Sequence, residues 1–253
     1  MVRGLYTAAT GMMVQRNKMD VLTNNLVNAE TAGFKRDTLV TSSFDQVMLS
    51  RIHDPNVSMY GGNPVGPYSF GTHIDELITS YLPGVMETTS QSTDLALVGD
   101  GFFAVETPAG ERYTRGGSFS VDGEGYLVNQ DGYYLLGQNG RVRVGSTDFL
   151  VGLDGAVSGS MANPDVLRVV SFEDTASLRK EGNNLYYAYG DAAPAAAEDV
   201  IVRQGMLEGS NVQLADEMVN LLTVYRKYEA SQKIVSMTDQ TLGMATAMGK
   251  VGG

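Results

Sequence analysis

The stretch NNLVNAETAGFKR, residues 24–36, ends one sequence pattern and begins another. Upstream of it, apolar residues recur at a strict seven-residue spacing: Leu5, Met12, Met19 and Leu26. This spacing is typical of a helix that packs against another helix. Gly33 readily adopts the left-handed conformation that closes many helices. We therefore predict a helix from about residue 5 to residue 28 that stops before Gly33.

The same spacing recurs near the other end of the sequence. It runs through Leu214, Leu221, Tyr228, Val235 and Leu242, with Met218 and Tyr225 at the second position of the stripe. Ser210 and Gln213 have the spacing of a capping box, and the pattern continues to about residue 248. Such a stripe needs a partner helix, and the N-terminal segment is the only other one with this repeat. We expect the two helices to pair as a coiled coil.

The middle of the sequence has a different pattern. Short runs rich in β-branched and aromatic residues alternate with turn sequences such as GDG, DGEG, QDG, QNG and LDG. The runs cover residues 94–98, 102–107, 112–115, 125–129, 133–137, 141–145 and 167–172. Strands separated by Asp-Gly or Asn-Gly predict hairpins. Between residues 34 and 70, Phe44, Val47 and Met48 suggest a short helix, followed by an extended connector.

These patterns together predict an α+β protein, with long N- and C-terminal helices paired as a coiled coil and a mainly-β domain inserted between them. The expected coiled-coil domain is discontinuous, comprising residues 1–33 and 209–253. Residues 34–70 form the connector and residues 71–208 the mainly-β domain.

Composition and charge exclude several classes of function. The net charge of −11 leaves no basic surplus to neutralise nucleic-acid phosphates. The chain has no cysteine, so disulfides, thiolate metal sites and cysteine nucleophiles are excluded. We expect neither a cleaved signal peptide nor insertion into a membrane, because no long apolar segment is present.

Motifs that could carry chemistry are better explained as structure. GDGFFA (99–104) resembles a dinucleotide fingerprint but continues as a strand, so we interpret it as a hairpin turn. Asp122 and Glu124 begin a calcium-loop pattern that lacks its later ligands and glycine. We therefore expect no catalytic, cofactor-binding or metal site. The remaining candidates are histidines without a metal motif and acids at turns that could form a glycosidase pair: His53, His73, Asp94, Asp100 and Asp122.

Several segments, in order along nearly the whole chain, resemble bacterial flagellar basal-body rod and hook proteins. These are NNLVNAETAGFKR, DLALVGDGFFAVET, YTRGGSFSVDGEGYLVNQDGYYLLG, LDGAVSG and GMLEGSNVQLADEMVNLLTVYRKYEASQKIVSMTDQTL. Hook proteins are usually longer. Chain length and the GDGFF form favour a rod position, distal rather than proximal.

The resemblance implies a structural subunit exported by the flagellar type III apparatus without a cleaved signal. It implies a helical homopolymer that contacts neighbouring rod and hook proteins and transmits torque. The terminal helices would form the inner core and the β domain the outer layer.

We also expect residues 24–36 to act as a hinge between these layers. Asn25 and Asn28 would bind freed backbone groups, Gly33 would turn the chain, and Phe34 would dock it onto a neighbouring subunit. Gly33→Val is then expected to impair assembly more than the stability of the β domain. Two alternatives remain at this stage, a surface-displayed β binding module and a carbohydrate-active enzyme.

Overall fold

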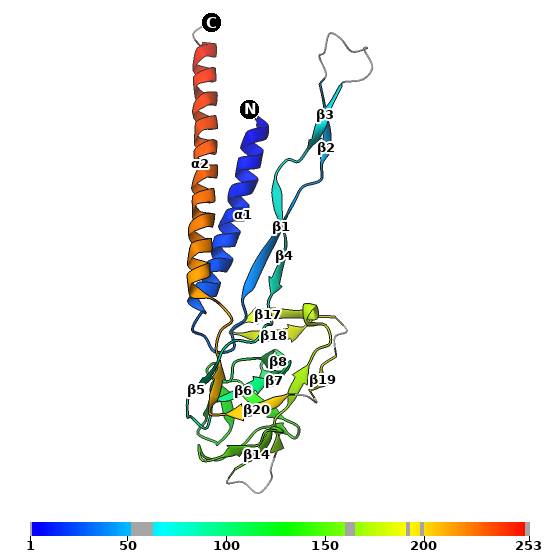
Figure 1. Cartoon of the computed structure of the whole chain (residues 1–253), viewed down its shortest axis with the longest axis vertical. Helices are drawn as coiled ribbons and strands as arrows, with labels where there is room; N and C mark the ends of the chain where they lie inside the picture. Colours follow the sequence, from blue (N-terminus) through cyan, green and yellow to red (C-terminus); the bar gives the residue numbers. More distant parts are fainter. Residues whose placement is uncertain (1, 52–62, 160–164, 191–192, 198–199, 251–253) are drawn as a thin grey trace. The chain divides into compact units, whose positions relative to one another are not determined.

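The computed structural model describes residues 2–51, 63–159, 165–190, 193–197 and 200–250 (Figure 1). Its contacts group the chain into two compact units. Unit 1 takes in residues 1–26, 37–78 and 214–253, and unit 2 takes in residues 27–36 and 79–213. The chain therefore passes between the units at four places along its sequence. The predicted α+β class is confirmed, with a helix at each end and strands between them.

Unit 1 contains the two long helices. Helix α1 spans Val2–Val27 and is slightly longer than predicted, whereas helix α2 spans Leu214–Lys250 and both begins and ends a few residues later than predicted. The capping box expected at Ser210 does not begin α2, because the helix starts one residue after Gln213. Two acidic residues, Asp216 and Glu217, lie in its first turn, where the helix dipole favours negative charge. Neither of these two helices is long and apolar enough to cross a membrane.

The rest of unit 1 is a two-stranded arm. Strand β1 (Asp37–Ser43) pairs with β4 (Thr72–Thr79), and β2 (Val47–Arg51) pairs antiparallel with β3 (Asn63–Tyr68). The short helix expected near Val47 is therefore wrong. Apolar residues there belong to a strand whose partner lies about twenty residues downstream, and a local pattern contains no information about that pairing.

The arm lies against α1 (Figure 1). Thr7 Oγ1 is 3.3 Å from the Tyr68 hydroxyl, and Lys18 Nζ donates to Thr41 Oγ1 at 3.3 Å. A Cβ added at Gly71 would overlap the side chain of Thr10, so the arm approaches the helix closely. An isolated two-stranded ribbon is marginally stable in water, and these contacts support it.

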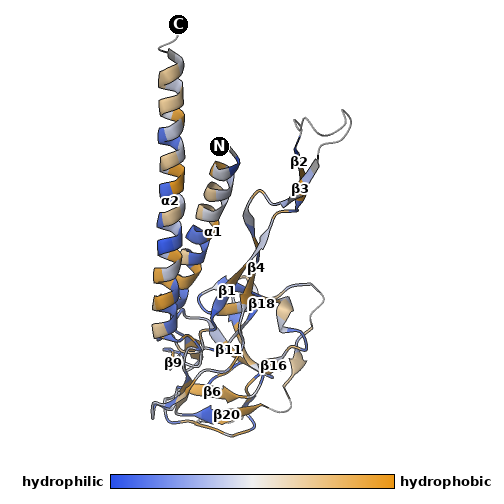
Figure 2. Cartoon of the chain, turned by 45° about the horizontal axis from the view of Figure 1, so that its top comes forward, coloured by the Kyte–Doolittle hydropathy of each residue, from blue (hydrophilic) through white to orange (hydrophobic). Residues whose placement is uncertain are grey.

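Helix α1 also lies alongside α2 (Figures 1 and 2). A Cβ added at Gly11 would be 3.9 Å from Ser231 Oγ. All four predicted stripe residues of α1 are partly buried, as is Leu22, while Ala8 is buried. Coiled-coil pairing of the two helices stays a prediction, because side-by-side helices need not interlock.

On α2 the least exposed residues step alternately by four and three positions. They are Glu217, Leu221, Val224, Tyr228, Ser231, Val235 and Thr238. Leu221, Tyr228 and Val235 were expected on this stripe. The second position was misplaced by one residue, because Met218 and Tyr225 are about half exposed, at 46% and 50%. Leu214 and Leu242, at the two ends of the predicted stripe, are exposed as well. Of Glu217 and Met218 the more apolar residue is on the uncovered side, whereas of Val224 and Tyr225 it is on the covered side.

Unit 2 is built around an antiparallel sheet. Within the described residues, ten strands belong to it, in the order β17-β18-β8-β7-β11-β10-β9, with β12 on β11 and β16 between β7 and β19. Their bounds are β7 (Phe102–Thr107), β8 (Gly110–Thr114), β9 (Phe119–Val121), β10 (Leu127–Asn129), β11 (Tyr134–Gly137), β12 (Gly140–Arg141), β16 (Val169–Ser171), β17 (Leu178–Gly182), β18 (Leu185–Ala188) and β19 (Ala195–Ala196).

Smaller sheets complete unit 2. Strand β6 pairs with β20, β5 pairs with β21, and β14 lies between β13 and β15. Their bounds are β5 (Met86–Thr88), β6 (Leu95–Val98), β13 (Leu150–Val151), β14 (Ala156–Ser158), β15 (Asp165–Val166), β20 (Ile201–Gln204) and β21 (Met206–Glu208), and a short 3-10 helix spans Thr175–Ser177. The run predicted at residues 141–145 is strand only at its first residue.

Most predicted turns are hairpins. The turns containing DGEG, QDG, QNG and LDG connect antiparallel neighbours. Asp122 Oδ1 accepts hydrogen bonds from the backbone N–H groups of Glu124 and Tyr126, and Asn129 does the same for the next turn. GDG is the exception, because β6 pairs with β20 rather than with β7. The side chains from the sheet faces fill two apolar clusters, one around Phe103 and Leu127 and one around Phe102 and Tyr186.

Candidate functional site

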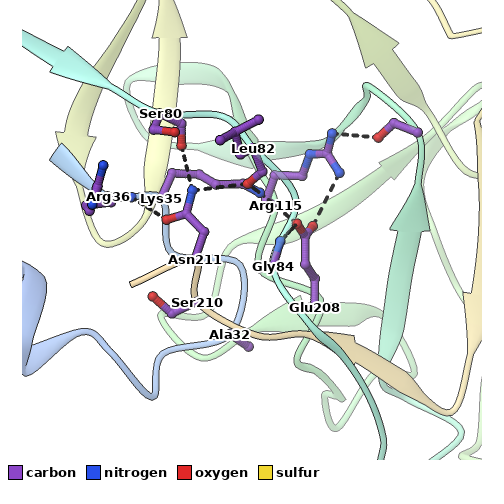
Figure 3. A network of polar contacts seen from close by, with 12 residues as sticks. Ala32, Lys35, Arg36, Ser80, Leu82, Gly84, Arg115, Glu208, Ser210 and Asn211 are labelled. Carbon is purple, nitrogen blue, oxygen red and sulfur yellow. Dashed lines mark hydrogen bonds and ion pairs between the residues drawn. The ribbon is translucent and has the colours of Figure 1, made fainter. Parts of the chain in front are cut away.

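Three segments of unit 2 lead to places where the chain leaves that unit: residues 27–36, 79–84 and 208–213. A network of polar contacts joins all three (Figure 3). Its centre is the carboxylate of Glu208, at the end of β21, whose side chain is only 1% exposed. We call this set of contacts the exit network; its members are Lys35, Arg36, Ser80, Leu82, Gly84, Arg115, Glu208 and Asn211.

Both oxygens of Glu208 have partners. Oε1 accepts from Lys35 Nζ at 2.6 Å and from the Gly84 backbone N–H at 3.0 Å. Oε2 accepts from Arg115 Nη1 at 3.3 Å, and Arg115 also donates to the Gly99 carbonyl at 2.7 Å. Two cations thus share one buried carboxylate. Burial lowers the pKa of Lys35, and the hydrogen bond and charge of Glu208 oppose this effect only in part.

Asn211 connects the same segments through its amide (Figure 3). Its Oδ1 accepts from the Arg36 backbone N–H at 2.7 Å, and its Nδ2 donates to the carbonyls of Ser80 at 2.8 Å and Leu82 at 3.1 Å. Lys35 Nζ donates to the same Leu82 carbonyl at 2.9 Å. A single side chain therefore satisfies backbone groups in two exit segments from a position in the third.

The four expected hinge residues divide between the units. Asn25 is fully buried in unit 1, where its amide donates to the Asp37 carbonyl at 2.8 Å and accepts from the Asp37 N–H at 3.0 Å. Asn28, Gly33 and Phe34 belong to unit 2. Asn28 Oδ1 accepts from Thr31 Oγ1 at 3.2 Å, so it closes the turn just after α1.

Gly33 has a φ of +70°, and its N–H donates to the Glu208 carbonyl at 2.7 Å. The next residue, Phe34, is buried in its own chain rather than presented to a neighbour. Lys180 Nζ lies 3.9 Å from the centre of its ring and donates to the Lys35 carbonyl at 2.6 Å. The expected docking of Phe34 onto another subunit is therefore not available to this conformation.

Sequence reasoning missed Lys35, Arg115, Glu208 and Asn211. Each looks like an ordinary surface residue in a turn or at the end of a strand. The sequence contains one weak indication of this network, because Lys35 and Arg36 directly follow Phe34 within the stretch of residues 24–36. Nothing local connects that lysine to a glutamate 173 residues away.

The chemical candidates do not form a site. Within the described residues, no group of three or more metal-binding side chains is close enough to hold an ion. Asp122 supports a hairpin, Asp94 is buried in a β-bridge with Ser118, and His73 Nε2 lies 3.1 Å from Ser42 Oγ. His53 lies outside the described residues. The structure therefore assigns turn and packing roles to Asp94, Asp122 and His73, and Asp100 lies exposed in the bend that follows β6.

Three family models match consecutive parts of the chain. "Flagella basal body rod protein" matches residues 5–35, "Flagellar hook protein FlgE/F/G D1 domain" matches residues 96–159, and "Flagellar basal body rod FlgEFG protein C-terminal" matches residues 203–248. The flagellar basal-body rod protein FlgF of Caulobacter vibrioides is 34% identical over 243 residues, covering 94% of each chain. This chain belongs to the flagellar basal-body rod and hook protein family.

Other members of the flagellar rod family match over similar lengths. The flagellar basal-body rod protein FlgG of Bacillus subtilis is 30% identical and covers 96% of this chain and 97% of its own. The flagellar hook-basal body complex protein FlhO of the same organism is 29% identical over 99% of this chain. These relatives are structural proteins, so the chain is a structural member of the family and not an enzyme.

The exit network lies close to the ends of two of the matched regions. The first model ends at Lys35 and the third begins five residues before Glu208. The ion pair between these two residues therefore joins the N-terminal and C-terminal regions that define the rod family.

Proposed function

We propose that this chain is a structural subunit of the flagellar rod, polymerising with copies of itself into a helical tube that transmits torque from motor to hook. Neighbouring rod and hook proteins are its other partners, and the flagellar basal body is its location. The observation that carries the proposal is a family match along both terminal helices and the β unit, at 94% or more of the chain.

Exposed apolar surface in unit 1 supports assembly. Large apolar side chains are exposed along the arm, including Met48, Val65 and Leu77, and along α2, including Leu222 and Met248. Surfaces of this kind mark contacts with other proteins. A contact between two different faces of the same chain, repeated from copy to copy, generates an open helical filament.

The pairing of α1 with α2 is part of this proposal. If Gly11 lies beside Ser231, the partly buried stripes align as antiparallel partners. Met12 then faces Ser231, Leu5 faces Thr238, and Leu26 faces Glu217. The alternation of three- and four-residue steps on both helices supports coiled-coil packing. Residues of α2 beyond about 241 have no counterpart on α1 and are left for other subunits.

The position in the rod and the route of export are also proposed. The GDGFF form supports the distal rod rather than the proximal rod. Export would use the flagellar type III apparatus without a cleaved signal.

A deletion strain tests the position. Loss of the gene should leave an axial structure that stops below the hook, and imaging of isolated basal bodies shows where it stops. A complete rod and hook in that strain would contradict the proposal.

Limited proteolysis tests assembly. The terminal helices should be cut readily in a dilute subunit and protected in isolated rods, because ordering of the apolar faces accompanies assembly. Equal protection of the helices and the β unit in the dilute chain would count against this proposal. A pull-down with the chain as bait that captured only non-flagellar partners would also count against it.

A further inference from the structure

Helix α1 has a third face that neither α2 nor the arm covers. Tyr6, Met13, Asp20 and Val27 recur on it every seven residues. The three apolar side chains are 60%, 65% and 74% exposed, and Asp20 is exposed too. We call this set the outer face of α1. It is an apolar stripe with one negative charge near its C-terminal end.

Helix α2 has an outer face of its own. Ile234, Met237, Met244 and Met248 are three, seven and four residues apart, which places them on one face of the helix, and their side chains are 49% to 72% exposed. At 3.6 residues per turn, they lie on a different side of α2 from the stripe through Leu221 and Val224. Toward the N-terminal end of α2, the same face carries two exposed basic residues, Arg226 and Lys233, on either side of Ala230.

Resting on the rod-subunit function above, the geometry points to a specific contact between copies: the outer face of α1 in one subunit packs antiparallel on the outer face of α2 in the next. In a filament whose screw axis runs along the helices, all copies have the same direction. Helix α1 of one copy is then antiparallel to α2 of its neighbour, as in the proposed pair within one chain.

The charges select the register of this contact. In the register proposed above for the pair within one chain, Tyr6 is level with Met237. A shift of one heptad, about 10.5 Å along the axis, brings Tyr6 level with Met244 and Met13 level with Met237. Asp20 then faces Ala230, between Arg226 and Lys233, three or four residues away on either side. No ion pair of Asp20, Arg226 or Lys233 occurs among the residues that the structure describes, so these charges are available to a neighbour.

Other registers fit less well. Without the shift, Met13 would face Ala230 and Asp20 would face Thr223. With a shift of two heptads, Asp20 would face Met237, which places a carboxylate on an apolar side chain. The occupant of the α2 face is therefore a second copy of this chain, displaced by one heptad.

Cysteine cross-linking in isolated rods tests the contact, because the chain has no cysteine of its own. Tyr6→Cys and Met244→Cys, carried by separate copies expressed together, should form a disulfide between subunits on oxidation. Met13→Cys with Met237→Cys should do the same. The matched control combines Met13→Cys with Met244→Cys, whose Cα atoms would be about 10 Å apart along the axis, beyond the reach of a disulfide.

The outcomes separate the two proposals. Rods that form but cross-link only in the Tyr6→Cys and Met237→Cys combination would overturn the shifted register. Rods that form without any of these cross-links would overturn the contact while leaving the rod function intact. A chain that is absent from isolated rods would overturn the rod function, and this contact with it.

Charge reversal gives a second, independent readout. Asp20→Lys should lower the amount of assembled protein at least tenfold, and Arg226→Glu with Lys233→Glu in the same chain should restore it. Glu229→Lys, an exposed reversal on another side of α2, is the control and should assemble normally. Failure of the triple variant to recover, with all variants folded by circular dichroism, would contradict the pairing of these charges.

Discussion

At the scale of the residue, the decisive feature is one carboxylate holding two cations in the interior. The side chains of Lys35 and Glu208 are each 1% exposed, and that of Arg115 is 4% exposed. Removing charges from water is costly, so the arrangement depends on complete hydrogen bonding of Glu208 by its two cations and the Gly84 N–H. The network therefore makes the geometry of the three exit segments sensitive to single substitutions.

Glu208→Gln should lower the free energy of unfolding of unit 2 by about 3–5 kcal/mol, because it leaves two buried cations without a counter-charge. Urea unfolding of the whole chain, followed by circular dichroism, measures the change. Glu106→Gln breaks the exposed ion pair with Arg141 and serves as the control, with little change expected. A similar small effect for both variants would show that the buried pair contributes little.

The lowered pKa of Lys35 gives a prediction for pH. The folded state binds the Lys35 proton less tightly than the unfolded state does, in which the pKa of the amine is 10.5. The contribution of Lys35 to stability is therefore largest above pH 10.5 and is lost as the pH falls through the lower pKa of the folded state. The unfolding free energy of the wild type, relative to Lys35→Met, should therefore rise with pH as it approaches 10.5. Paired urea titrations of the two proteins across this range make the test. If the unfolding free energy of the wild type relative to Lys35→Met fell as the pH rose, the prediction would be wrong.

At the scale of the element, the stretch after α1 is fixed in unit 2 rather than free to bend. An added Cβ at Gly33 would overlap the backbone of Arg115 and Gly116. The expectation that Gly33→Val impairs assembly more than the stability of the β unit stays a prediction, but this overlap means that the substitution destabilises the β unit as well. The turn that follows α1 is part of the packing of unit 2, and a side chain there disturbs the sheet residues beneath it.

Gly33→Ala should accordingly destabilise unit 2 by roughly 2 kcal/mol or more, from the left-handed backbone and the close approach together. Gly132→Ala is the matched control, because Gly132 also has a positive φ of 82° but has open space around it. Thermal or urea unfolding measures the stability of both variants, and we expect Gly33→Ala to lose more unfolding free energy than Gly132→Ala. Equal losses would mean that the backbone conformation alone matters.

At the scale of the whole molecule, the chain combines a well-packed β unit with helices that leave apolar faces exposed. The longer helix extends beyond the residues that α1 can cover in the proposed register. Formation of a tube would bury these apolar faces between subunits, so we expect unit 1 to act in assembly.

Removing residues 242–253 should therefore abolish assembly while changing the unfolding free energy of unit 2 by less than about 0.5 kcal/mol. Counting rods in a strain that expresses only the shortened chain tests the first part, and urea unfolding of the purified protein tests the second. Normal rods from the shortened chain would show that the end of α2 is dispensable.

The sequence by itself determined the two terminal helices, most strands and the turns, because those signals act within a few residues. Seven-residue repeats predicted α1 and α2, and Asp122 predicted its hairpin. The family resemblance also followed from sequence alone. The strands of the arm, the choice of Val224 over Tyr225 on the inner stripe and the buried pair of Lys35 with Glu208 were decided only in the tertiary structure. Each depends on which distant segments meet, and that is set by the burial of the whole chain rather than by any local pattern.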